Sequence, residues 1–220
     1  MKVLALVATQ RKSGNSDILT DIALQGVKDG GGIIEKIYLK DIFIKPCKGC
    51  LRCNILGYCS IKDDDFNKFK DKFLKSDAII LSSPVYYHYI TGQMKVLIDR
   101  FRSTFYVKIT PEGLEHTFIY EKGKTFLFIL TLGHPEITDA LPAIESLKLW
   151  VKTTCKNPVI LKPIIATFLA LPNQINASKE KLEKIFTKMK IPLDILDEKY
   201  DLYQNLLDNA YRSGRILANK

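Results

Sequence analysis

The chain has 220 residues, of which 46% are hydrophobic, and this suffices for one domain with a substantial core. No apolar run approaches the ~20 residues of a membrane-spanning helix, so the composition excludes an integral membrane protein and we expect no membrane partner. The formal net charge is +9, but the lysines are spread over helical patterns and form no basic and aromatic stripe, so we also expect no nucleic-acid partner.

Strands and helices are predicted to alternate along the chain. Continuous apolar runs predict five strands, at residues 2–8, 33–39, 78–81, 125–132 and 158–166, the last one interrupted by Pro163. Amphipathic spacing predicts helices at residues 16–27, 64–75, 92–105 and 139–154, and two C-terminal helices at about 178–219, centred on 179–189 and 201–218.

This alternation is typical of an α/β fold with a doubly wound parallel sheet and helices on both faces. Five strands favour the flavodoxin-like order 2-1-3-4-5, in which the ligand lies beyond the carboxyl ends of strands 1 and 3. We expect a single flavodoxin-like domain over residues 1–220, with binding loops after those two strands.

The loop after the first strand, residues 9–16, combines hydroxyl side chains, one glycine and two cations. Asn15 or Ser16 is placed to cap the following helix. Backbone N–H groups at a helix N-terminus bind phosphate, so the loop suits a mononucleotide phosphate. An ordinary capped turn is the alternative, since the same residues are common in turns. The position after strand 1 favours the phosphate.

The loop after the second strand, residues 45–62, holds four closely spaced cysteines. The spacing is C-x2-C-x2-C-x5-C, formed by Cys47, Cys50, Cys53 and Cys59. Overlapping x2 steps let successive thiolates surround one centre, as in iron–sulfur sites, whereas zinc usually takes two knuckles with a longer spacer. Reduced or redox-active thiols are the main alternative, and zinc is the weaker one.

Disulfides are disfavoured for this cysteine run. The fifth cysteine, Cys155, makes the number of thiols odd, and the N-terminal sequence lacks the pattern of a signal peptide. We therefore expect reduced thiols and a cytoplasmic location. Cys155 follows an apolar helix face, where a buried and inert thiol is the default.

The loop after the third strand, residues 82–93, is unusually aromatic. Pro84 stiffens its start, and Tyr86, Tyr87 and Tyr89 offer flat surfaces with polar tips that suit a planar heterocycle. Aromatic packing beneath the loop and a subunit contact are the alternatives. His88 is assigned no catalytic role, and the sequence contains no convincing acid–base constellation.

With these motifs the chain resembles the NADPH-dependent FMN reductase and flavodoxin-like superfamily, and specifically its iron–sulfur flavoprotein branch. The resemblance covers about residues 1–132 in order. It rests on the compact cysteine run, on Arg11-x2-Gly14-Asn15-Ser16, and on Ser83-Pro84-Val85-Tyr86 followed by Met94-Lys95 and Asp99-Arg100. Thr9-Gln10 departs from the Gly-Ser-Pro common in the family.

The resemblance implies FMN and a [4Fe–4S] cluster as cofactors. The FMN phosphate would be held by Arg11, Ser13, Asn15 and Ser16. The ring and ribityl chain would be lined by Pro84, Val85, Tyr86 and Tyr87, with Thr131, Leu132 and Gly133 completing the ring pocket. The cluster ligands would be Cys47, Cys50, Cys53 and Cys59. Lys95, Asp99 and Arg100 look structural.

The predicted function is that of an FMN-dependent oxidoreductase passing electrons between a ferredoxin-like donor and an acceptor. A cluster-free NAD(P)H-dependent FMN or quinone reductase is the first alternative, and an electron carrier or zinc-stabilised flavin-binding module is the second. Since the cysteine loop leaves the same sheet edge as the flavin loops, electrons would pass to a flavin of the same or a neighbouring subunit. We expect a homo-oligomer, a dimer or tetramer, because the tyrosines of the aromatic loop and the apolar faces of the C-terminal helices need cover. The apolar side chains concerned are Leu202, Leu206, Leu207 and Tyr211. The alternative is that these helices pack wholly on their own sheet.

Overall fold

The computed structural model describes residues 1–219. Its centre is a parallel sheet in the order β2-β1-β3-β7-β8. Its strands are β1 (Lys2–Val7), β2 (Ile33–Tyr38), β3 (Ala78–Tyr86), β7 (Thr125–Thr131), β8 (Val159–Ile160) and β9 (Ile164–Ala166), which also pairs parallel with β7. The predicted flavodoxin-like order is confirmed, with β7 as fourth strand. The fifth is divided into β8 and β9 around Pro163, which cannot donate to the ladder.

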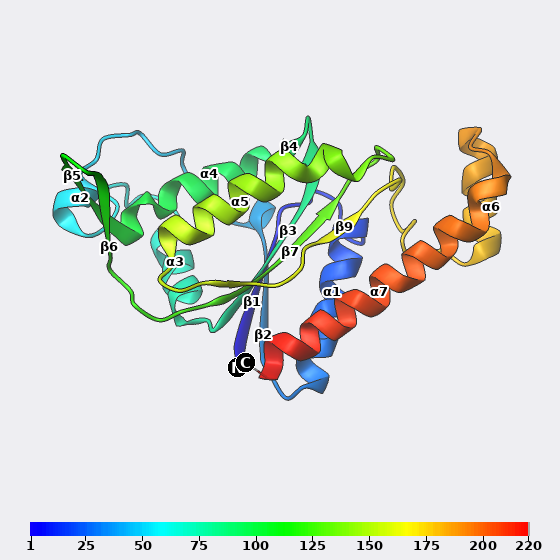
Figure 1. Ribbon diagram of the computed structural model, residues 1–220, viewed down its shortest axis with the longest axis horizontal. Coiled ribbons are helices and arrows are strands. Elements are labelled where there is room, and N and C mark those ends of the chain that lie inside the picture. Colours follow the sequence, from blue (N-terminus) through cyan, green and yellow to red (C-terminus); the bar gives the residue numbers. More distant parts are fainter. Residues whose placement is uncertain (220) are drawn as a thin grey trace.

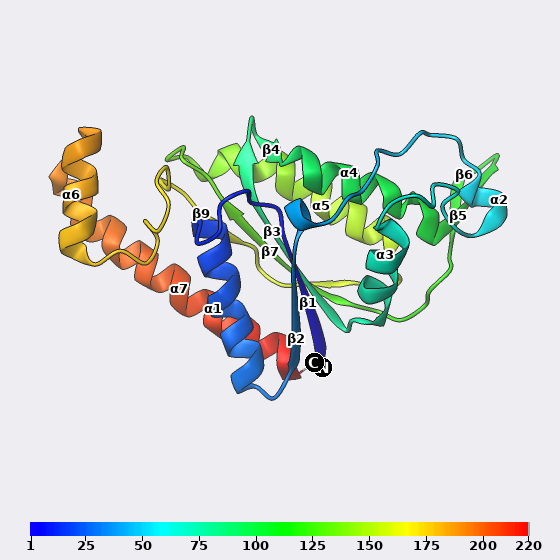
Figure 2. The same ribbon diagram turned by 180° about the vertical axis from the view of Figure 1, so that it is seen from behind.

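Helices cover both faces of the sheet (Figures 1 and 2). One face carries α1 (Asn15–Asp29) and α7 (Leu196–Asn219), with α6 (Lys179–Met189) at the far end of α7. The other carries α3 (Phe66–Lys75), α4 (Gly92–Arg100) and α5 (Leu141–Thr154). Short 3-10 helices are η1 (Leu39–Asp41), η2 (Phe101–Thr104), η3 (Ile137–Ala140) and η4 (Leu193–Ile195).

Strand β1 shows why these strands read as continuous apolar runs. Its successive side chains point to opposite faces of the sheet. Val3 and Ala5 belong to the core beneath α1 and α7, whereas Leu4 and Leu6 belong to the core beneath α3, α4 and α5. Because both faces are covered, both sets of positions must be apolar.

Helices α1 and α7 cross at very short range. A Cβ atom added at Gly214 would lie 1.9 Å from the carbonyl oxygen of Ala23, and one added at Gly26 would lie 2.1 Å from that of Tyr211. Both distances are far inside van der Waals contact with backbone atoms, which cannot rotate away. The two glycines therefore set how closely α7 lies against α1.

We expect Gly214→Ala to lower the free energy of unfolding by about 1–3 kcal/mol, as other insertions into a packed core do. The loss outweighs the gain of up to ~1 kcal/mol in helix propensity that alanine brings. Urea denaturation measures the free energy of unfolding of the variant and of wild type. Gly92→Ala is the matched control, because a Cβ at Gly92 meets nothing within 4 Å. Equal stability of the two variants would contradict the close crossing.

Two regions differ from the predicted elements. Strand β3 continues to Tyr86 and pairs with a short antiparallel strand, β4 (Tyr89–Ile90), so the aromatic loop is mostly a hairpin. Helix α4 ends at Arg100, and residues 105–118 form an unpredicted hairpin of β5 (Phe105–Thr110) and β6 (Gly113–Phe118). The alternation of residues 105–110 and the Pro-Glu-Gly turn were signals for it.

The last helix covers its own apolar face. Leu206 is buried, and Leu202 and Leu207 pack against the core between α7 and the sheet. The hydroxyl of Tyr211 donates a hydrogen bond of 2.8 Å to Asp29 on α1. The predicted need for a partner subunit at these four residues is therefore not borne out. Within residues 1–219, no helix has both the length and the apolar character needed to cross a bilayer.

Candidate functional site

A pocket of about 250 Å³ lies at the carboxyl ends of β1, β3 and β7, and we call it the strand-end pocket. Every residue predicted to bind flavin lines it except Ser13 and Tyr87. The lining residues are Thr9, Arg11, Asn15, Ser16, Pro84, Val85, Tyr86, Thr131, Leu132, Gly133, Leu169 and Ala170. Thr9, Leu169 and Ala170 were not predicted.

The side chain of Asn15 holds the wall of this pocket. Its Oδ1 accepts backbone N–H groups of Gln174 and Ile175 at 3.0 and 3.1 Å, and its Nδ2 donates to the carbonyl of Leu171 at 2.8 Å. Asn15 thus fastens the segment after β9, including Leu169, to the start of α1. Its side-chain amide is used within the protein, so a ligand here would meet its backbone N–H.

The floor of the pocket is formed by two paired hydroxyls. The Oγ atoms of Ser16 and Thr131 lie 2.6 Å apart and join the start of α1 to the end of β7. Gly14 is the N-cap of α1 and provides no side-chain cap for the first turn. The first N–H groups of a helix have no partner within the helix, so they remain available for an anion in the pocket.

Ser13 lies outside the pocket for a local reason. It has a left-handed backbone with φ of 59°, its side chain is exposed, and its N–H donates to Asp17 Oδ2 at 2.8 Å. Asp17 is itself buried and also accepts the hydroxyl of Tyr38 at 3.0 Å. Asp17 therefore shapes the loop after β1.

Lys36 offsets the negative charge of Asp17 beneath the loop. Its Nζ lies 2.5 Å from Asp17 Oδ1 and 2.6 Å from Asp21 Oδ1. Burial acts to lower the pKa of Lys36, but the hydrogen bonds with Asp17 and Asp21 outweigh it and raise the pKa above its usual range. The lysine is thus charged, and the carboxylate repels an anion above it less strongly.

Arg11 is the cation that lines the strand-end pocket. Its side chain is exposed and makes no hydrogen bond or ion pair within the part of the chain that the structure describes. The neighbouring Lys12 is also exposed but does not line the pocket. Arg11 is therefore free to contact an anionic ligand.

The β3–β4 hairpin forms one rim of the pocket. Tyr87 and His88 connect the strands with positive φ angles of 49° and 64°, as in a two-residue type I′ turn. This turn leaves Tyr86 on the pocket side, while Tyr87 is 97% exposed at the tip. His88 pairs with Asp139 of η3 when its imidazole is protonated.

The four loop cysteines all line a second pocket, which we call the cysteine pocket. Cys59 is buried, Cys53 is half-buried, and Cys47 and Cys50 are exposed. Its other lining residues are Lys48, Gly49, Leu51, Ser60, Ile61, Arg100, Arg102 and Ser103. Cys155 is buried after α5 and is not part of it.

Two of these thiols have environments that move their pKa in opposite directions. A backbone N–H of Arg52, followed by the Ser60 hydroxyl 3.6 Å away, lowers the pKa of the Cys50 thiol. Burial raises the pKa of the Cys53 thiol, and the charge of Arg102 partly opposes it. Arg102 Nη1 lies 4.0 Å from Cys53 Sγ, so a thiolate there has a cation beside it.

The cysteine pocket brings all four loop thiols to one lining. Within residues 1–219, no group of three or more His, Cys, Asp and Glu side chains is placed to hold a single metal ion. A [4Fe–4S] cluster takes one thiolate for each iron, so its ligands surround a wider centre than those of one ion. The donor set of four thiols with two arginines fits such an anionic group.

The two pockets lie at opposite ends of α4. Residues 84–86 of the strand-end pocket precede this helix, whereas Arg100 of the cysteine pocket is its last residue and Arg102 and Ser103 follow it. The helix alone spans about 13 Å. The cysteine loop starts at the predicted sheet edge but extends along α4 to α2 (Cys53–Leu56) and the β5–β6 hairpin (Figure 2). The sequence had suggested that the cysteine loop lies beside the flavin loops. Within one chain it does not.

Comparison with known proteins adds to this geometry. A family model described as NADPH-dependent FMN reductase matches residues 1–134. That range contains the loop after β1, the cysteine run and the β3–β4 hairpin. Leu169 and Ala170, and the segment that Asn15 fastens, lie outside the match.

Curated relatives agree with this family, and a solved structure agrees with the fold. One iron–sulfur flavoprotein of Archaeoglobus fulgidus is 34% identical over 136 residues, which is 62% of this chain and 58% of that protein. A second from the same organism is 32% identical over 161 residues, which is 64% of this chain and 79% of that protein. An FMN-dependent NADH-azoreductase from Bacillus anthracis, solved with FMN, has a TM-score of 0.66 over 100% of both chains at 16% identity, a likeness of fold.

Proposed function

Because this chain belongs to the NADPH-dependent FMN reductase family, we propose that it is an FMN-dependent oxidoreductase that also carries a [4Fe–4S] cluster. The observation that carries the proposal is that all four loop cysteines line one pocket together with Arg100 and Arg102. We further propose that it passes electrons between a ferredoxin-like donor and an acceptor. FMN exchanges electrons singly or in pairs, which is the chemistry that would join a one-electron centre to a two-electron partner.

The strand-end pocket provides the groups that FMN requires. Its phosphate would meet the first-turn N–H groups of α1 and the side chain of Arg11, where the helix dipole also favours an anion. The ring and ribityl chain would lie along Pro84, Val85 and Tyr86 and against Leu132. Asn15 would not contact FMN through its side chain but would hold in place the pocket wall that contains Leu169.

The cysteine pocket provides the ligands and the charge for the cluster. Cys47, Cys50, Cys53 and Cys59 would each bind one iron. Arg100 and Arg102 would offset the negative charge of the cluster and its thiolates. Burial of Cys59 would shield one side from water, while Cys47 and Cys50 would leave the opposite side accessible to an electron partner.

We propose that the flavin and the cluster that exchange electrons belong to different subunits. Within one chain the length of α4 separates the two pockets. Helix α2 and the β5–β6 hairpin lie at one end of the molecule (Figure 1), and α2 contributes Cys53 to the cysteine pocket, so a neighbouring copy has access there. This arrangement needs a homo-oligomer, either a dimer or a tetramer.

Anaerobic purification with iron, sulfide and flavin assays tests the cofactors. We expect four iron and four sulfide per chain and one FMN, with a brown colour from broad absorption beyond the flavin bands. A purely yellow protein that never takes up sulfide would instead support the cluster-free NAD(P)H-dependent FMN or quinone reductase. Turnover with NADPH or with reduced ferredoxin then identifies the donor.

The oligomeric state has a test at the exposed apolar side chains beside the cysteine pocket. Ile55 on α2 and Ile109 on β5 are 85% and 82% exposed, and Asn54 joins the two elements through hydrogen bonds with both backbone groups of Val107. We expect the double variant Ile55→Glu with Ile109→Glu to dissociate the oligomer, because it would bury two carboxylates.

Light scattering at micromolar concentration measures the mass of wild type and variants. The matched control is Ile33→Glu, because Ile33 is 69% exposed on β2, away from α2. A wild-type protein with the mass of one chain would contradict the oligomer. An oligomer that persists in the double variant, or that the control dissociates equally, would contradict an interface at α2 and β5.

A further inference from the structure

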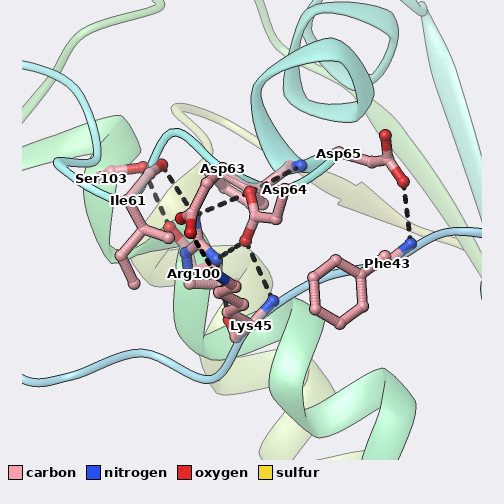
Figure 3. A network of polar contacts seen from close by, with 9 residues as sticks. Phe43, Lys45, Ile61, Asp63, Asp64, Asp65, Arg100 and Ser103 are labelled. Carbon is pink, nitrogen blue, oxygen red and sulfur yellow. Dashed lines mark hydrogen bonds and ion pairs between the residues drawn. The ribbon is translucent and has the colours of Figure 1, made fainter.

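Arg100 connects the two ends of the cysteine loop (Figure 3). Its Nη1 donates to the carbonyl of Lys45 at 2.7 Å, before the first cysteine, and its Nη2 donates to that of Ile61 at 3.4 Å, after the last one. Both nitrogens also bond to the carboxylate of Asp64. Arg100 is 1% exposed, so these bonds form in a buried site.

Asp64 completes the connection. Its Oδ2 accepts the N–H of Lys45 at 3.0 Å, and its Oδ1 accepts the N–H of Phe66 at 3.1 Å, at the first residue of α3. Next to it, Phe43 and Asp65 exchange two hydrogen bonds, of 2.8 and 2.9 Å. Residues 43–45, the stem before the cysteines, are therefore bonded to residues 61–65, the stem after them. Arg100 bonds to both stems.

The remaining donor of Arg100 has no partner. Its Nε is buried and makes no hydrogen bond within residues 1–219, while the same side chain lines the cysteine pocket. A buried donor without a partner is costly, so an acceptor is expected beside it. An arginine guanidinium stays protonated in proteins, and here it is paired with the carboxylate of Asp64. The guanidinium thus remains a cation next to the cysteines.

We propose that Arg100 is the positioning residue of the cysteine pocket: it closes the loop before any cluster is present and directs its Nε–H towards sulfur at the site. Only the statement about Nε–H and sulfur rests on the proposed [4Fe–4S] function; the closing of the loop does not. Fixing the ends of a flexible loop opposes its conformational entropy, and the planar guanidinium can bond both ends at once. Lysine has three N–H donors but only one nitrogen, so it lacks the two separate nitrogens with which Arg100 reaches the carbonyls of Lys45 and Ile61.

The test compares Arg100→Gln and Arg100→Lys with Arg102→Gln. Arg102 also lines the pocket, but it bonds to Phe105 and to Asn54 of α2, and so leaves the two stems unconnected. Iron, sulfide and FMN per chain are measured after anaerobic reconstitution. We expect both Arg100 variants to lose iron and sulfide at least fivefold while keeping FMN, and Arg102→Gln to lose less.

Two further readouts separate a positioning role from general stability. Cluster-free proteins are treated with trypsin, which cleaves after Lys48, Arg52 and Lys62 in the loop. We expect faster cleavage there in the Arg100 variants than in wild type. In the cluster that Arg100→Lys retains, we expect a lower midpoint potential, since a donor to sulfur stabilises the reduced form.

Full iron and sulfide in Arg100→Lys, or equal losses in Arg102→Gln, would overturn the proposal. If Arg100→Gln does not fold, as absent FMN would reveal, Arg100→Lys decides, because it keeps a cation beside Asp64. A wild type that never takes up iron and sulfide would refute the proposed function instead. The tryptic comparison would then still show whether Arg100 closes the loop, and an unchanged cleavage pattern would refute that as well.

Discussion

Replacing Cys50 or Cys53 with serine is expected to abolish the iron–sulfur chromophore and to leave FMN bound. Both thiols line the cysteine pocket, and a serine hydroxyl stays protonated where a thiolate is needed to bind iron. FMN should be retained because the strand-end pocket lies at the other end of α4 and shares no lining residue with the cysteine pocket. Absorption spectra with iron, sulfide and flavin assays provide the measurement.

Cys155→Ser is the control for this experiment. Cys155 is 5% exposed, burial raises the pKa of its thiol, and it does not line the cysteine pocket. We expect the spectrum and the iron content to remain those of wild type. Zinc in place of iron, or a chromophore that survives in both loop variants, would reject the assignment of the cluster to these cysteines.

The fold was predictable because the strands of a sheet covered on both faces are apolar at consecutive positions. Residues 3–8 and 126–130 are apolar at consecutive positions, which excludes a strand with one face in water. The β5–β6 hairpin escaped prediction because it packs on α2 rather than in the main sheet, and several of its side chains are exposed. Local alternation alone was a weaker signal than the helical pattern that precedes it.

The site was less predictable wherever it depends on contacts between distant segments. The wall at Leu169 and its attachment to Asn15 join residues more than 150 positions apart, and no local motif indicates such a contact. The sequence suggested a structural role for Arg100. The structure shows what that role is, because its side chain bonds to the carbonyls of Lys45 and Ile61 at the two ends of the cysteine loop. The left-handed backbone of Ser13 and the bond of its N–H to Asp17 also separated it from the strand-end pocket.

Arg11→Ala is expected to weaken FMN binding about ten- to a hundredfold, which corresponds to the ~1.5–3 kcal/mol of a hydrogen bond to a charged group. Arg11 is the cation that lines the strand-end pocket, and its side chain makes no hydrogen bond or ion pair among the described residues that would have to break. Flavin fluorescence during titration of the flavin-free protein measures the dissociation constant.

Lys12→Ala and Ser13→Ala are the matched controls for Arg11. Both positions belong to the same loop and are exposed, but neither lines the pocket, so each variant should bind FMN within about twofold of wild type. Raising the salt concentration should narrow the difference between wild type and Arg11→Ala, because screening weakens the contact that the variant lacks. If Lys12→Ala weakened binding as much as Arg11→Ala, the loop would attract the phosphate by its overall charge, and if neither did, the phosphate would lie elsewhere.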